Sequence, residues 1–271
     1  MANDQQILLE AIDLQKNFPR TSGAFADTTS QNKFTAVDAV SFEVFTGETF
    51  AIVGESGCGK TTLARMLLRL IEPDAGKIIF AGRELTALSS QEMRAERRHL
   101  QMVFQDPYAS LNPRMRVGEI VAEPLAIHEP KLTATERRER ASAMLRRVGL
   151  TEESASRYPH EFSGGQRQRI GIARALILRP KLVIADEPVS ALDVSVGAQM
   201  LVLLRELQQE FGLTYLLISH SLPVVAQVAT RIAVMRAGKF VELGAAEQIL
   251  RHPQHPYTKE LLAAVPELPL A

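Results

Sequence analysis

Short apolar segments separated by polar turns run along most of the chain. Residues 7–18 place Ile7, Leu9, Ile12 and Leu14 among polar neighbours and predict a first β-strand. Residues 37–45 predict a second, in which Phe42 and Val44 share one face and Glu43 lies on the other. Nearly continuous apolar segments, typical of buried strands, follow at residues 50–53, 100–104, 182–185 and 213–218. Because helix-like segments come between these strands, we predict an α/β fold that begins with an antiparallel β part.

The segment 106–161 differs from the rest of the chain, because prolines separate its helical stretches. Within it, residues 133–148 predict an amphipathic helix whose apolar stripe is formed by Ala141, Met144, Leu145 and Val148. The charges of this helix are mixed in sign, so we interpret it as a solvated helix and not as a nucleic-acid-binding arm. We predict a single domain over residues 1–271, with an α/β core (1–105 and 162–250), an inserted helical subdomain (106–161) and a C-terminal extension (251–271).

Composition disfavours several classes of protein. Lys and Arg number 31, as do Asp and Glu, so the chain lacks the excess positive charge of a typical nucleic-acid-binding protein. No apolar run reaches the roughly 18–20 residues that span a bilayer, and the N-terminus lacks the pattern of a secretory signal. Cys58 is the only cysteine, which excludes an internal disulfide and a Cys-based metal cluster. We therefore expect that any work at a membrane depends on other chains.

Residues 54–62 have the composition of a phosphate-binding loop between a strand and a helix. Its glycines permit turns in which backbone N–H groups point toward a polyphosphate at a helix N-terminus. Lys60 is expected to reach the β- and γ-phosphates, and the Thr61 hydroxyl to bind Mg²⁺. Cys58 is expected to contribute its backbone N–H, and its thiol could be alkylated to block the site. The predicted nucleotide-binding residues are Gly54, Glu55, Ser56, Gly57, Cys58, Gly59, Lys60, Thr61 and Thr62.

A second motif narrows the choice among kinases, GTPases and ATPases. Residues 161–169 read Glu-Phe-Ser-Gly-Gly-Gln-Arg-Gln-Arg and resemble the signature of ATP-binding-cassette (ABC) ATPases, with Phe162 in place of the usual Leu. A helix that opens at these residues would be a second anion site, although a Ser N-cap beside two flexible glycines is the simpler alternative. The resemblance implies a dimer in which Ser163, Gly164, Gly165 and Gln166 cover the ATP bound to the other subunit.

Other positions match catalytic residues of this family, which implies a P-loop NTPase of the ABC type with ATP and Mg²⁺ as cofactors. Asp186 would hold Mg²⁺, directly or through water, and Glu187 would orient and polarise the attacking water. Lys60, on the phosphates, is counted among the catalytic residues as well. Taken alone, such an acidic pair after a strand is commonly a helix N-terminal carboxylate. Gln105 would join the metal and water site to the helical subdomain, and His220 would contact the γ-phosphate.

Two further positions are implied by the same resemblance. Asp193 lies in the segment that runs along the dimer seam of such ATPases. Phe18 is the candidate for stacking on adenine, although a core phenylalanine is nearly as good an interpretation. Ser221 follows the histidine where the family often has an acidic residue, a difference from which we expect little effect on turnover.

The stretches 105–115, 252–258 and 261–266 resemble ATPase subunits of bacterial oligopeptide, dipeptide and nickel importers. A turn capping a C-terminal helix is the local interpretation of His-Pro-Tyr at 255–257. The resemblance implies an ABC importer ATPase at the cytoplasmic face of the inner membrane. Its partners would be a second, different ATPase subunit, two membrane permease subunits and indirectly an extracytoplasmic binding protein, with no nucleic acid.

The sequence constrains the identity of the transported substrate less than it constrains the mechanism. Short peptides are our prediction, by family analogy, over nickel chelates, opines or sugars. Some ATPases of this branch carry a Cys-rich iron–sulfur site, which a chain with one cysteine excludes. A soluble cassette ATPase acting on ribosomes or DNA is the alternative of another class. It usually has two cassettes or a long coiled-coil insertion, and this chain has neither.

Overall fold

Contacts between Cα atoms group the chain into two units. The computed structural model describes residues 6–19 and 33–264. One unit comprises Met1–Ser89 and Ile218–Ala271, and the other comprises Ser90–Leu217. The predicted insertion 106–161 lies wholly within the second unit, and its boundaries stay a prediction. The polar segment at 20–32 and the chain end at 265–271 lie outside the described residues, so part of the stretch 261–266 does as well.

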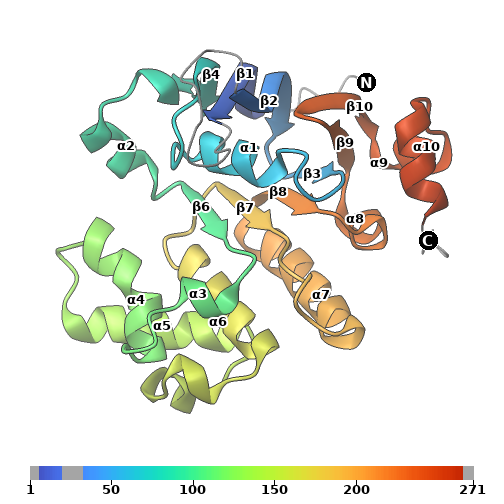
Figure 1. The fold of residues 1–271 in the computed structure, drawn as a ribbon. Helices are drawn as coiled ribbons and strands as arrows, with labels where there is room; N and C mark the ends of the chain where they lie inside the picture. Colours follow the sequence, from blue (N-terminus) through green and yellow to red (C-terminus); the bar gives the residue numbers. More distant parts are fainter. Residues whose placement is uncertain (1–5, 20–32, 265–271) are drawn as a thin grey trace, which may run out of the picture. The chain divides into compact units, whose positions relative to one another are not determined.

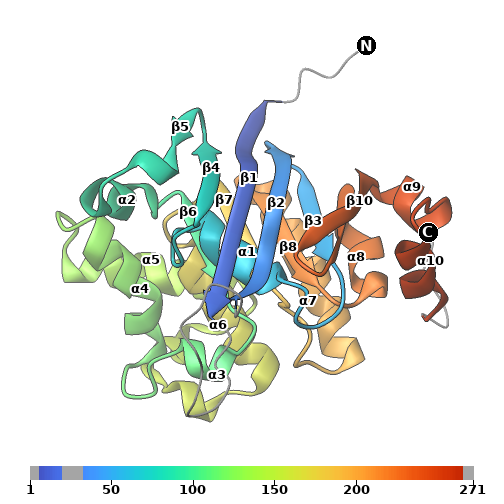
Figure 2. The ribbon, with the colours of Figure 1, turned by 45° about the horizontal axis from the view of Figure 1, so that its top comes forward.

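The first unit contains the predicted antiparallel β part. Its sheet has the order β2-β1-β4-β5, and the long strands β1 and β2 lie side by side (Figures 1 and 2). In β1, Leu9 and Ala11 lie two positions apart and are both buried, and Leu14 is buried beyond a register irregularity of the strand. The strands are β1 (Ile7–Pro19), β2 (Lys33–Phe45), β4 (Ala75–Phe80) and β5 (Arg83–Glu84), followed by the short 3₁₀ helix η1 (Leu85–Ala87).

A second group of strands in this unit surrounds the predicted phosphate loop. β3 (Thr49–Val53) is buried along its whole length and pairs in parallel with β9 (Arg231–Arg236), which pairs antiparallel with β10 (Lys239–Ala245). The helix α1 (Lys60–Leu67) follows β3 after the loop. The remaining helices of the unit are α8 (Leu222–Val228), α9 (Ala246–Arg251) and α10 (Pro256–Ala263). A buried strand thus leads directly into the loop, as the apolar segment 50–53 predicts.

The second unit combines parallel strands with a helical part. β6 (Leu100–Val103) and β7 (Leu182–Asp186) run in parallel. β8 (Thr214–Ser219) comes next in the sheet order, and its last two residues belong to the first unit. The helices are α2 (Ser90–Glu96), α3 (Pro107–Ser110), α4 (Val117–His128), α5 (Ala134–Arg147), α6 (Gly164–Leu176) and α7 (Val194–Phe211), with the 3₁₀ turns η2 (Glu152–Ser156) and η3 (Pro159–Glu161).

The helical part packs on the apolar stripe that the sequence predicts. α4, α5 and α6 lie together and contact one another (Figure 1). The whole stripe of α5 and its C-cap is buried. α5 begins with a capping box, in which Thr133 Oγ1 accepts from Glu136 N and the Glu136 carboxylate accepts from Thr133 N. None of the helices among the described residues is long and apolar enough to cross a bilayer. The amphipathic helix is therefore confirmed as a structural element.

Candidate functional site

The loop between β3 and α1 encloses the side chain of Lys60. The Lys60 ammonium donates to the backbone oxygens of Gly54 and Glu55, at 2.7 and 2.8 Å, and lies 3.7 Å from Cys58 Sγ. Only 5% of Lys60 is exposed. A cation held inside a loop at the N-terminus of α1 adds to the positive end of the helix dipole. The loop therefore has the geometry and the charge to bind an anion.

Two glycines of this loop are required by close backbone contacts. A Cβ added at Gly54 would lie 2.1 Å from Met235 O, and one added at Gly59 would lie 2.1 Å from Ala36 O. Gly59 also has φ 113°, which L side chains rarely adopt. The carbonyls come from the end of β9 and from β2, so these strands set the path of the loop.

Cys58 lies inside the same loop. Burial raises the pKa of the Cys58 thiol, and the neighbouring Lys60 ammonium only partly opposes this shift. The side chain is 8% exposed. Because the thiolate is the reactive form, the structure argues against ready alkylation at neutral pH.

Tyr257, which the sequence presents only within the stretch 252–258 that resembles peptide-importer ATPases, also contacts this loop. The backbone N–H of Glu55 donates to the Tyr257 hydroxyl at 3.2 Å. Tyr257 lies in α10, about 200 positions away in sequence, and is 1% exposed. Sequence reasoning treated His-Pro-Tyr as a turn, which is correct: His255 Nδ1 accepts from Tyr257 N at 3.1 Å and caps α10. The contact with the loop could have been suspected from Tyr257 itself, because the hydroxyl of a buried tyrosine usually needs a hydrogen-bond partner.

The ends of β6 and β7 bring together two of the predicted catalytic residues. Gln105 Nε2 donates to Glu187 Oε2 at 2.9 Å. Parallel strands end at the same edge of a sheet, where ligands of α/β proteins commonly bind. Glu187 adopts φ 48°, a left-handed conformation supported by Ser190, whose hydroxyl and N–H both donate to Glu187 O. Asp186, which ends β7, is 3% exposed.

The predicted signature forms the N-terminus of α6. Ser163 and Gln166 make a capping box: Ser163 Oγ accepts from Gln166 N at 3.3 Å, and Ser163 N donates to Gln166 Oε1 at 3.0 Å. The N-cap interpretation is thus correct as local structure, and it leaves both residues exposed at the positive end of the helix. A Cβ at Gly165 would lie 2.6 Å from Val196 Cγ1. Asp193 accepts from Val196 N at 3.0 Å, so the signature adjoins the predicted dimer seam.

The remaining predicted residues are placed within the first unit. His220 is exposed and comes directly after β8. Phe18 is half-buried near the end of β1, opposite Phe34 of β2, with Lys16 Nζ 5.7 Å from its ring centre. The first unit thus holds the phosphate loop, His220 and Phe18. The second unit holds Gln105 and Glu187, the signature and Asp193.

The donors predicted for Mg²⁺ suit that ion chemically. Thr61, Gln105 and Asp186 all offer oxygen atoms, the ligands Mg²⁺ prefers. Within residues 6–19 and 33–264, no group of three or more His, Cys, Asp or Glu could hold a metal ion. Mg²⁺ usually binds one or two carboxylates together with substrate phosphates and water. The donor set therefore fits a metal shared with a nucleotide.

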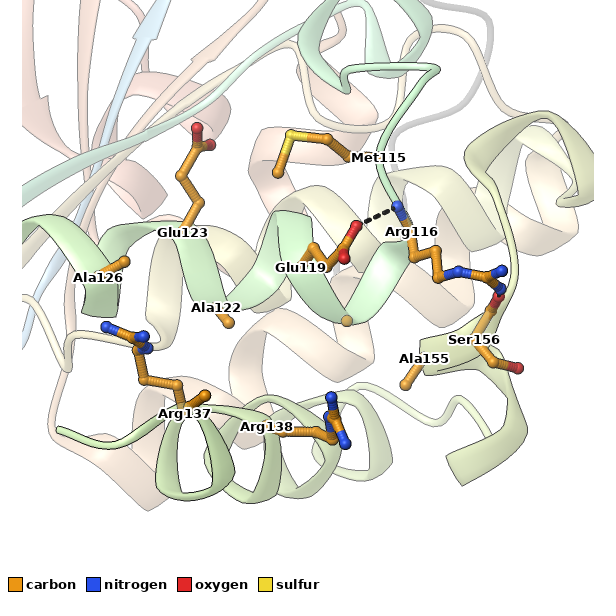
Figure 3. A pocket seen from close by; sticks show the side chains of 12 residues that line it. Met115, Arg116, Glu119, Ala122, Glu123, Ala126, Arg137, Arg138, Ala155 and Ser156 are labelled. Carbon is orange, nitrogen blue, oxygen red and sulfur yellow. Dashed lines mark hydrogen bonds between the residues drawn. The ribbon is translucent and has the colours of Figure 1, made fainter.

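A cavity of about 660 Å³ opens in the helical part of the second unit. Its wall includes three alanines of α4 and α5, and Arg137, Arg138, Glu119 and Glu123 bring charge to it (Figure 3). Its lining includes none of the residues predicted to bind nucleotide or metal. None of the candidate catalytic residues therefore belongs to the wall of this cavity.

Comparison with known proteins assigns the chain to a family. The family described as ABC transporter matches residues 37–190, and the family described as oligopeptide/dipeptide transporter, C-terminal region, matches residues 241–270. The oligopeptide transport ATP-binding protein AppF of Bacillus subtilis is 52% identical over 98% of this chain and 80% of its own length. The dipeptide transport ATP-binding protein DppF of Escherichia coli is 52% identical over 97% of this chain and 78% of its own.

A solved structure agrees with this assignment. A dimeric ATP-binding cassette in a post-hydrolysis state, bound to ADP and Pi, superposes with a TM-score of 0.77 at 28% identity and covers 88% of this chain and 99% of its own. The predicted ABC-type α/β fold is therefore confirmed. From the extent of the family match and from relatives about half identical over nearly its whole length, this chain belongs to the ABC transporter family.

Proposed function

We propose that this chain is the ATP-binding and hydrolysing subunit of an importer for short peptides. The observation that carries the proposal is its identity of about one half to oligopeptide and dipeptide transport ATP-binding proteins, which spans the cassette and the C-terminal region. ATP hydrolysis is the activity of the cassette family to which the chain belongs. The peptide is recognised by other subunits, so the ATPase supplies energy and not specificity.

The phosphate loop supplies the binding energy for ATP in this proposal. Lys60 and the inward N–H groups of the loop hold the β- and γ-phosphates, with the adenine stacked on Phe18. His220 contacts the γ-phosphate. Mg²⁺, when bound, neutralises charge on the phosphate oxygens, and Thr61, Asp186 and Gln105 provide its protein ligands directly or through water.

Glu187 activates water in the hydrolysis step. Its carboxylate accepts a hydrogen bond from the water, places the water oxygen in line with the γ-phosphorus and draws its proton as the new P–O bond forms. The bond from the γ-phosphorus to the bridging oxygen breaks in the same step, so that ADP leaves and inorganic phosphate is formed. The 2.9 Å hydrogen bond from Gln105 Nε2 holds this carboxylate in place. Gln105 begins the connection into the helical part, so the pair links the water site to the region that we expect to contact the permease.

The signature completes the site from a second subunit. Ser163, Gly164, Gly165 and Gln166 of one cassette cover the γ-phosphate bound to the other. Asp193, which caps α7 by accepting from Val196 N, lies on the seam in this proposal. We propose that the second subunit is a different, homologous ATPase.

The remaining partners follow from the transporter assignment. Two membrane permease subunits hold the ATPase pair at the cytoplasmic face of the inner membrane, as a peripheral component. An extracytoplasmic binding protein delivers peptide to the permease and reaches the ATPase only indirectly. We propose no nucleic-acid partner, in keeping with the balanced charge.

The decisive experiment measures ATP hydrolysis by the complex that co-purifies with this chain, reconstituted in lipid with its binding protein. We expect a mixture of short peptides to stimulate hydrolysis, and Glu187→Gln to abolish the stimulated rate. An active ATPase indifferent to peptides would refute the peptide substrate and direct the search to nickel chelates, opines or sugars. Co-sedimentation with ribosomes, unaffected by deletion of the permease subunits, would refute the transporter role altogether.

A further inference from the structure

The C-terminal His-Pro-Tyr turn is connected to the phosphate loop by a series of hydrogen bonds within the first unit. The Glu242 carboxylate of β10 accepts from the backbone N–H groups of Gln254 and His255, at 2.8 and 3.1 Å. His255 in turn caps α10 through Tyr257 N. Both views place α9 and α10 on the side of β10 (Figures 1 and 2), and α9 contacts both β9 and β10. The turn is therefore fixed to the strands that support the loop.

The turn directs the Tyr257 side chain to the start of the loop. Its ring is buried, with the Arg236 guanidinium 4.5 Å from the ring centre. Its hydroxyl oxygen accepts the Glu55 N–H at 3.2 Å. Burial raises the pKa of the Tyr257 hydroxyl, which keeps it neutral at physiological pH. Glu55 comes directly after Gly54, whose carbonyl accepts from Lys60, so Tyr257 holds the segment that positions the lysine.

We propose that Tyr257 is a positioning residue for the phosphate loop: its hydroxyl holds the Glu55 N–H, so the C-terminal turn sets the loop geometry and thereby the affinity for nucleotide. This inference rests on the proposed role of the loop in binding ATP. It gives the C-terminal region a function inside the cassette, in addition to any contact it makes with other subunits.

The test is equilibrium binding of ADP, which is not hydrolysed, to the full-length chain carrying Tyr257→Phe. This change removes only the oxygen and keeps the ring against Arg236. We expect the ADP dissociation constant to rise about three- to tenfold, the effect of one lost neutral hydrogen bond. The matched control is Tyr215→Phe, because Tyr215 is buried and its hydroxyl has no hydrogen-bond partner among the described residues. The control should leave ADP affinity unchanged.

Two readouts separate positioning from mere stability. Without nucleotide, hydrogen–deuterium exchange of the backbone amides of residues 54–62 should be faster in Tyr257→Phe than in the unchanged protein. The melting temperature of the variant should change little. A lower melting temperature with unchanged ADP affinity and unchanged exchange in this peptide would overturn the inference. Equal losses of affinity in Tyr257→Phe and Tyr215→Phe would overturn it as well.

Lys60→Ala distinguishes failure of the inference from failure of the proposed function. If Lys60→Ala abolishes ADP binding and Tyr257→Phe leaves it intact, the loop binds nucleotide and only the role of Tyr257 is refuted. If Lys60→Ala itself binds ADP normally, the assignment of the loop is refuted and the role of Tyr257 falls with it.

Discussion

Replacing Gly59 by alanine is the most stringent test of the loop geometry. The new Cβ would lie 2.1 Å from Ala36 O, whereas Cβ atoms essentially never approach other atoms below 3.0 Å. The loop or strand β2 must therefore move by at least about 0.9 Å. A displacement of about 1 Å at a site of phosphate chemistry costs on the order of 100-fold in rate. The left-handed φ adds about 1–2 kcal/mol of strain.

Gly238→Ala is the matched control. Gly238 also has a positive φ, of 83°, and its added Cβ would approach the same Ala36 oxygen, but at 3.2 Å. That contact requires a shift of a few tenths of an ångström only. The control thus carries similar backbone strain with a smaller clash, although Gly238 N also donates to Cys58 O of the loop. We expect the φ strain that both variants share to lower the free energy of unfolding by about 1–2 kcal/mol, and Gly59→Ala to lose more than Gly238→Ala because the backbone clash adds to that strain.

Steady-state ATP hydrolysis by the reconstituted complex is the assay, with circular dichroism to confirm folding. We expect Gly59→Ala to lose about 100-fold in rate and Gly238→Ala to lose less than tenfold. Equal rates for the two variants would refute the reasoning from close contacts. A folded Gly59→Ala protein with near-normal turnover would refute the geometry of the loop itself.

Three further predictions concern single side chains. Glu187→Gln should reduce the rate of ATP hydrolysis by roughly 100-fold or more, while ATP still binds. The ATP-bound dimer should persist and can be detected by size-exclusion chromatography with ATP. Near-normal turnover would contradict the role of this carboxylate. Lys60→Ala should weaken ATP binding itself by at least about tenfold in equilibrium titrations, because a charged donor to the phosphates is lost. Burial raises the pKa of Cys58 and disfavours the thiolate, so its alkylation by iodoacetamide should be slower than that of a model thiol at pH 8. The alkylation rate should reach its plateau only at a higher pH than for the model thiol. A pH profile like that of the free thiol would contradict the buried position.

Much of the architecture could be read from local patterns. The alternation in β2, the buried segment that becomes β3 and the apolar stripe of α5 each appear as predicted, whereas register irregularities interrupt the alternation of β1. Such patterns are local because one buried face imposes its period on neighbouring residues. The ends of elements were predicted less well: the second strand begins at Lys33, several residues before the predicted start at 37. Pairing with β1 extends it beyond its alternating part.

The chemistry of the candidate site could also be named from residue types and their order. Glycines, Lys60 and Thr61 in one short run after an apolar strand are enough to predict a phosphate loop, since backbone turns and charge act over a few residues. The signature and the pair at 186–187 were predicted from resemblance in the same way. Their roles in ATP hydrolysis stay predictions for the experiments above.

By itself, then, the sequence determined which segments form strands and helices, which motifs are present and which family the chain resembles. Only the tertiary structure decided which residues meet. Gln105 and Glu187 are 82 positions apart and share a hydrogen bond, and Glu55 and Tyr257 are 202 apart and do so too. The tertiary structure also distinguished Gly59 from Gly238, through the distance from an added Cβ to the Ala36 carbonyl oxygen. The physical reason is that such contacts depend on how sheets and helices pack, whereas sequence patterns record only the conformation and burial of neighbouring residues.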